Sequence, residues 1–93
     1  MSRRRILVVS DEPTPRLELA AILTEAGYSV QVACDGKEGL ASAGINPPDL
    51  VLSDIEMPEM DGYEFCRRIR ADQRFHSTKV VLLTSRSDVA EVV

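Results

Sequence analysis

The sequence predicts an α/β fold, in which a doubly wound parallel sheet carries helices on both faces. Short, continuously apolar runs such as Ile6–Val9 and Leu50–Ser53 are typical of strands that are buried on both faces. Segments with helical periodicity or helix-capping residues separate these runs, and this alternation favours a parallel sheet. The chain has 93 residues, 44% of them hydrophobic, and shows no repeat or linker. It therefore suits one small domain.

The order of elements is strand and helix in alternation, and capping residues mark where helices begin. Thr14 is the expected N-cap of the first helix, with Pro15 at its first position and an apolar stripe over Leu19–Ala26. Asp61 and Glu64 form a capping-box-like pair before the third helix. The predicted strands are Ile6–Val9, Tyr28–Ala33, Leu50–Ser53 and Lys79–Leu83, and the predicted helices cover residues 15–26, 37–43, 62–71 and 87–93.

Composition excludes several classes of function. Acidic side chains outnumber basic ones by 15 to 11, which argues against a dedicated nucleic-acid surface. The four arginines between residues 67 and 74 have helical spacing and are interpreted as a solvated helix face. No segment is long enough to span a membrane or serve as an export signal, so a cytoplasmic location is expected. Cys34 and Cys66 are expected to be reduced thiols and not a zinc site or disulfide.

Polar residues follow three of the predicted strands at their carboxyl ends, where ligands bind in open parallel sheets. They are Ser10–Glu12, Asp54 and Thr84-Ser85. If the first and third strands are neighbours, Asp11 and Asp54 face each other, and such carboxylates need a cation between them. Mg²⁺ suits oxygen ligands and also accepts phosphate oxygens. Each residue alone is more often a turn former or helix cap, but their coincidence predicts a metal–phosphate site.

Three blocks of sequence resemble the receiver domains of response regulators in bacterial two-component signalling. They are Ile6–Pro13, Val51–Gly62 and Val81–Ser85, and the resemblance covers essentially the whole chain in order. It implies a flavodoxin-like sheet with strand order 2-1-3-4, so that residues 1–93 form a receiver that lacks the fifth strand and helix. It also implies a stoichiometric phosphoacceptor and not an enzyme, with a histidine kinase or phosphotransfer domain as partner. Further domains of the same polypeptide are compatible with it, and direct nucleic-acid or membrane contact is not expected.

The resemblance also implies roles for the matched positions. Asp54 would be the phosphoacceptor and, with Asp11, a ligand of Mg²⁺. Glu56 would offer its backbone carbonyl to the same metal. Thr84 would contact the phosphoryl group and move on activation, and Gly62 would permit the tight entry into the third helix.

The sequence departs from the family pattern in two places. Ser10 stands where the family usually has the first of two acids, so weaker Mg²⁺ binding is expected, with the hydroxyl able to hold a metal-bound water. No lysine follows Lys79, although the family has one that pairs with the phosphoryl group. The fourth strand is expected to be an open edge, through which this form of the chain could dimerise.

Two other functions are compatible with parts of the pattern. A pseudo-receiver that acts only through protein contacts is favoured by Ser10 and disfavoured by the set of Asp11, Asp54 and Thr84. A phosphatase of the haloacid-dehalogenase type would have a second aspartate two residues after its nucleophile, where this chain has Glu56. Dinucleotide binding is excluded, because no G-x-G-x-x-G follows the first strand.

Overall fold

The computed structural model describes residues 3–83 and 90–92 of the chain, and its elements form one five-stranded sheet with helices on both faces. The sheet order is β2-β1-β3-β4-β5, and the first four strands are parallel. The predicted α/β class and the strand order 2-1-3-4 are therefore confirmed. The elements are β1 (Arg5–Val9), α1 (Pro13–Glu25), β2 (Ser29–Ala33), α2 (Gly36–Ile45), β3 (Leu50–Asp54), α3 (Gly62–Ala71), a 3-10 turn (Gln73–Phe75), β4 (Lys79–Leu83) and β5 (Ala90–Val92).

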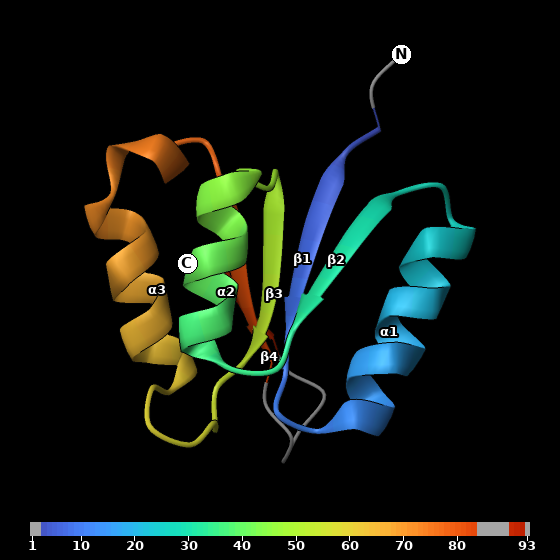
Figure 1. The fold of residues 1–93 in the computed structure, drawn as a ribbon, viewed down its shortest axis with the longest axis horizontal. Coiled ribbons are helices and arrows are strands. Elements are labelled where there is room, and N and C mark those ends of the chain that lie inside the picture. Colours follow the sequence, from blue (N-terminus) through green and yellow to red (C-terminus); the bar gives the residue numbers. More distant parts are fainter. Residues whose placement is uncertain (1–2, 84–89, 93) are drawn as a thin grey trace.

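The two faces of the sheet are covered unequally. Helices α2 and α3 lie together on one face, and α1 lies alone on the other (Figure 1). The main core is on the α2–α3 side, where alternate strand residues such as Leu7 and Val9 meet Phe65 and Ile69 of α3. Helix α1 contains no buried residue, and its Ile22 is 64% exposed. The apolar stripe predicted for this helix is thus only partly covered.

Helix α1 begins earlier than the sequence predicts. Its first residue is Pro13, and Glu12 occupies the N-cap position without a side-chain capping bond, so the prediction of Thr14 as N-cap is wrong. A residue that precedes proline is biased toward extended conformation, and Glu12 adopts it with φ −97° and ψ 118°, whereas Thr14, which precedes Pro15, lies within the helix. Because an N-cap residue needs this conformation and proline suits the first helical position, the Glu12-Pro13 pair starts the helix.

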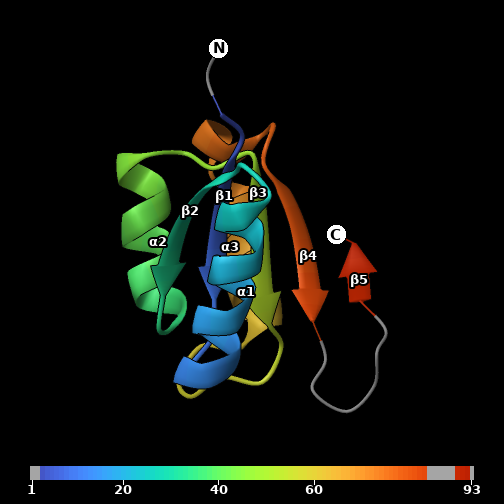
Figure 2. The same cartoon turned by 90° about the vertical axis from the view of Figure 1, so that its right-hand side faces the viewer.

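The end of the described chain also differs from the prediction. Residues Ala90–Val92, expected in a helix over 87–93, form β5 and pair antiparallel with β4, Val81 opposite Val92 (Figure 2); the rest of that predicted helix lies outside the described residues. The backbone groups at the edge of β4 offer hydrogen-bond partners to an added strand, and Val92 is a β-branched residue of the kind that favours strands. The predicted open edge of β4 is therefore wrong, and a dimer through that edge loses its basis.

Two smaller predictions concern the cysteines and the membrane. Cys34 is exposed, Cys66 is buried, and both are free thiols. Burial raises the pKa of the Cys66 thiol, so this side chain behaves as a small apolar residue of the core. Within residues 3–83 and 90–92, no helix has the length and apolar character needed to cross a bilayer.

Candidate functional site

The carboxyl ends of β1, β3 and β4 border a cavity of about 590 Å³. Its lining contains five carboxylate side chains and no lysine or arginine among the residues that the structure describes. An acidic cavity without basic groups concentrates negative potential and attracts cations. The lining residues are Asp11, Glu12, Asp54, Ile55, Glu56, Met57, Pro58, Asp61, Tyr63 and Leu83.

Strand pairing brings the predicted acidic residues to this edge. Strands β1 and β3 are parallel neighbours, with Val9 opposite Ser53, so the residues that follow each strand emerge side by side. Asp54 is the last residue of β3, and Asp11 lies in the loop that follows β1. Glu56 also lines the cavity. The structure thus brings Asp11, Asp54 and Glu56 together, whereas Thr84 lies outside the described residues.

Ser10 contacts the Asp54 carboxylate directly. Its hydroxyl donates a hydrogen bond to Asp54 Oδ2 at 2.6 Å, and the serine is only 3% exposed. The sequence suggested only a water-mediated metal role for Ser10 and did not predict this contact. Its position at the end of a strand paired with β3 is the one signal in the sequence that points to it.

The environment of Asp54 disfavours its charged form. Partial burial raises the pKa of the Asp54 carboxyl above its usual value, and the nearby negative charge of Asp11 raises it further. The hydrogen bond from Ser10 acts in the opposite direction, because it stabilises the carboxylate. Among the described residues that line the cavity, no basic side chain neutralises these two carboxylates, and a bound cation would supply that countercharge.

The donor atoms fit one class of metal ion better than others. No group of three His, Cys, Asp or Glu side chains that could hold a metal is present in the described part of the chain. A zinc site, with its four tetrahedral ligands, is thus not formed by these residues. Mg²⁺ retains several waters and is commonly held by one or two carboxylates together with phosphate oxygens. Asp11 and Asp54 fit that pattern, and the other carboxylates of the cavity add to its attraction for a cation.

The loop between β3 and α3 is shaped by two unusual backbone positions. Glu59 has φ 68°, a left-handed conformation that is unfavourable for a residue with a side chain. Gly62 starts α3 with its amide hydrogen-bonded to the Ile55 carbonyl oxygen at 2.7 Å. These two residues direct the loop around the cavity, so that Met57 packs into the core while Glu56 and Asp61 line the cavity.

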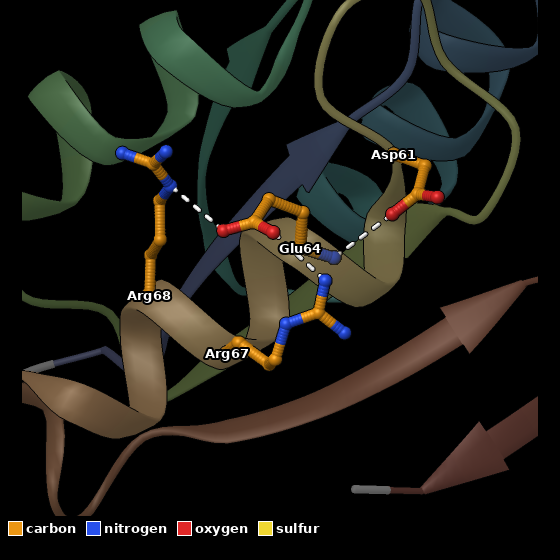
Figure 3. Close-up of polar contacts among 4 residues, drawn as sticks. All are labelled: Asp61, Glu64, Arg67 and Arg68. Atoms are coloured by element: carbon orange, nitrogen blue, oxygen red, sulfur yellow. Dashed lines mark hydrogen bonds and ion pairs between the residues drawn. The ribbon is translucent and has the colours of Figure 1, made fainter.

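The first turn of α3 is capped as predicted in one direction only. Asp61 accepts a hydrogen bond from the Glu64 amide at 2.8 Å, but the Glu64 carboxylate binds Arg67 and Arg68 instead of returning to Asp61 (Figure 3). The reciprocal half of the predicted capping box is therefore wrong. Hydrogen bonds from Arg67 and then Arg68 lower the pKa of the Glu64 carboxyl. Neither arginine lines the cavity, whereas Asp61, predicted only as a cap, does.

Comparison with known proteins identifies the family. Residues 6–93 match the family model described as the response regulator receiver domain. The chain belongs to this family. It is thus a receiver domain of the kind found in two-component systems, as the sequence blocks predicted, and its fold is that of the family's solved structures.

Several curated relatives are longer than this chain. The "DNA-binding dual master transcriptional regulator RpaA" of Synechocystis sp. is 36% identical over 89 residues, which cover 96% of this receiver and 37% of RpaA. The "Response regulator MprA" of Mycobacterium sp. (strain KMS) is 42% identical, with 96% of this chain and 38% of MprA covered. The receiver thus spans about two fifths of the length of these relatives.

Similar receivers have been solved. The chemotaxis protein CheY4 of Vibrio cholerae has a TM-score of 0.88 and 34% identity, and the match covers 92% of this chain and 72% of that one. The response regulator TrrA of Thermotoga maritima, solved in complex with Mg(2+)-BeF, has a TM-score of 0.81 and 41% identity, with 88% of this chain and 70% of that one covered.

Proposed function

We propose that this receiver accepts a phosphoryl group on Asp54 from a histidine kinase or a phosphotransfer domain, in a Mg²⁺-dependent reaction in the cytoplasm. The observation that carries the proposal is the position of Asp54 at the end of β3, inside an acidic cavity that it shares with Asp11. TrrA, a similar receiver, was solved in complex with Mg(2+)-BeF, which supports the same use of this cavity here.

The chemistry is an in-line displacement at phosphorus. One Asp54 carboxylate oxygen attacks the phosphorus, the phosphorus–nitrogen bond to the donor histidine breaks, and the electron pair of that bond leaves with the imidazole. The product is an acyl phosphate on Asp54 and a free histidine. Asp11, Asp54 and the Glu56 carbonyl are the groups that would hold Mg²⁺, which neutralises charge on the transferring oxygens when bound. Thr84 is proposed to contact the phosphoryl group.

The charge of the cavity makes the cation important in this proposal. Among the described residues, no basic side chain lines the cavity, and Lys79 is the first residue of β4, at the opposite end of the strand from Leu83. An incoming phosphoryl group adds negative charge to a cavity that already contains five carboxylate side chains. We therefore expect phosphorylation to require a divalent cation.

Labelling with a small-molecule phosphodonor tests the proposal. Wild-type protein incubated with acetyl phosphate and Mg²⁺ should gain one phosphoryl group per chain, measured by intact-protein mass spectrometry. Asp54→Asn and excess chelator should each abolish the gain, whereas the matched control Asp72→Asn, in a carboxylate beyond the other end of α3, should label normally. A label that persists in Asp54→Asn, or that forms equally well with chelator, would contradict the proposal.

A second candidate function is a pseudo-receiver that works only through protein contacts. It is favoured by one observation, the serine at position 10 where the family usually has an acid. It predicts that wild-type protein gains no phosphoryl group and gives no Mg²⁺-dependent spectral response to beryllofluoride. A phosphatase would instead hydrolyse a small-molecule phosphate ester over many turnovers, whereas a receiver would gain at most a single stoichiometric label.

A further inference from the structure

Ser10 is held rigidly by its own backbone and by its neighbours. Its amide donates to the Ala33 carbonyl at 3.1 Å, and its carbonyl accepts from the Arg16 guanidinium at 2.8 Å. The Glu12 amide donates to the Ser10 hydroxyl oxygen at 3.3 Å. With its amide, carbonyl and hydroxyl oxygen all engaged and the residue 3% exposed, the hydroxyl is preorganised to donate in one direction.

That direction is toward Asp54. The hydroxyl has one proton, and its distance to Asp54 Oδ2 is 2.6 Å, against 3.4 Å to the Glu12 carbonyl. A short O–H···O⁻ bond of this length is typical of a charge-assisted hydrogen bond, which is about twice as strong as a neutral one. Ser10 thus hydrogen-bonds Asp54 Oδ2 and leaves Asp54 Oδ1 available to attack phosphorus. An ionised acid at position 10 would have no proton to donate.

We propose that Ser10 is a positioning residue that shortens the lifetime of the acyl phosphate on Asp54, an inference that rests on the proposed function. When Oδ1 carries the phosphoryl group, Oδ2 is the carbonyl oxygen of a neutral acyl group and accepts a weaker hydrogen bond. In hydrolysis, water attacks the phosphorus, the phosphorus–Oδ1 bond breaks, and its electron pair returns to the carboxylate. Inorganic phosphate leaves, and the water's protons pass to phosphate and solvent.

The Ser10 hydrogen bond therefore strengthens as this reaction proceeds. Negative charge returns to the Asp54 carboxylate in the transition state, and a fixed donor that meets developing charge lowers the barrier. The same donor stabilises the free carboxylate more than the acyl phosphate. Ser10 thus favours the unphosphorylated form in both rate and equilibrium.

The test compares acyl-phosphate lifetimes in three variants. Each protein is phosphorylated with acetyl phosphate and Mg²⁺, the remaining acetyl phosphate is removed, and the loss of the phosphoryl group from the protein is followed over time. Ser10→Ala should lengthen the half-life roughly three- to tenfold, and Ser10→Thr, which keeps the hydroxyl, should restore a half-life near that of wild type. Ser53→Ala is the matched control, because Ser53 is also buried but donates to the Asp54 backbone carbonyl at 2.9 Å and not to its carboxylate.

The outcomes separate this inference from the proposed function. If wild-type protein takes no label, the proposed function fails and the inference falls with it. If wild-type protein labels but Ser10→Ala decays as fast, or Ser53→Ala lengthens the half-life equally, only the inference is overturned. Infrared spectra of the unphosphorylated protein give a second measurement: the carboxylate stretch of Asp54, identified by its loss in Asp54→Asn, should shift in Ser10→Ala and not in Ser53→Ala. An unshifted band in Ser10→Ala would also overturn it.

Discussion

The amide of Gly62 donates a hydrogen bond to the Ile55 carbonyl oxygen at 2.7 Å, which ties the first residue of α3 to the residue that follows Asp54. The approach is so close that a Cβ atom at position 62 would lie 2.4 Å from the Asp54 carbonyl oxygen and 2.9 Å from the Ile55 Cα. Both are backbone atoms, so they can move aside only if the end of β3 moves. The position of the Asp54 side chain therefore depends on the absence of a side chain at residue 62.

Gly62→Ala should destabilise the fold by about 2–3 kcal/mol, because the added methyl group forces a backbone shift in a packed region. Urea denaturation followed by circular dichroism measures this change. Gly44→Ala is the matched control: it lies in α2, and its Cβ would meet only the flexible Arg74 guanidinium, at 3.3 Å. The control should be neutral or more stable by about 0.5–1 kcal/mol, as for glycine to alanine within a helix. Equal effects of the two substitutions would contradict this account.

Glu59→Gly should stabilise the protein by up to about 1 kcal/mol, because it relieves the left-handed conformation at φ 68°. The same denaturation measurement applies. Glu59→Ala removes the carboxylate but keeps the Cβ, and hence the backbone strain, so it should bring no gain. If alanine stabilises as much as glycine, the benefit comes from losing an acidic side chain and not from the backbone.

Asp54→Asn should stabilise the metal-free fold at neutral pH, and the gain should disappear in acid. The folded-state pKa of Asp54 is raised, so the protonated carboxyl is the form that the fold favours. The stability that this carboxyl contributes is fully present below its unfolded-state pKa and is lost as the pH rises through its folded-state pKa. Asparagine cannot ionise and so avoids this loss. Unfolding free energies measured with chelator at neutral and acidic pH test the sign. In Asp72→Asn the sign should be opposite, because hydrogen bonds from Arg74 lower the pKa of Asp72.

Ser10→Asp should raise the affinity for Mg²⁺, on the order of tenfold, because it adds a carboxylate beside Asp54. Calorimetric titration of Mg²⁺ into wild type and variant measures the difference. Cys34→Asp is the control, because it adds the same charge at an exposed residue outside the cavity lining. Unchanged affinity in Ser10→Asp would mean that position 10 does not limit metal binding.

The parallel sheet was predictable because its signals are local. Continuous apolar runs mark β1, β3 and β4, and all five residues of β4 were predicted. The start of α1 was not, because two adjacent residue pairs, Glu12-Pro13 and Thr14-Pro15, each carry a start signal, and the sequence does not decide between them. The helix prediction for Ala90–Val92 was wrong for a different reason. A segment of Ala, Glu and Val fits a helix or a strand, and the neighbouring edge of β4 decides between them.

The candidate site was predictable at the level of which residues meet, and not of how they bond. The proximity of Asp11 and Asp54 could be predicted from their positions after two strands, because the carboxyl ends of parallel strands share one edge of the sheet. The hydrogen bond from Ser10 depends on side-chain direction, which residue spacing does not specify. The same holds for Glu64, whose carboxylate had two arginines within reach on its own helix as well as the Asp61 amide.

Helix α1 contains no buried residue, whereas α2 and α3 share the main core. Segments with few buried apolar contacts open locally at a lower free energy than the rest of a fold. In native-state hydrogen exchange, the amides of α1 should therefore exchange before those of β1, β3 and α3, without global unfolding. Since Arg16 of α1 binds the Ser10 carbonyl, each such opening would also release the support beneath the serine that contacts Asp54.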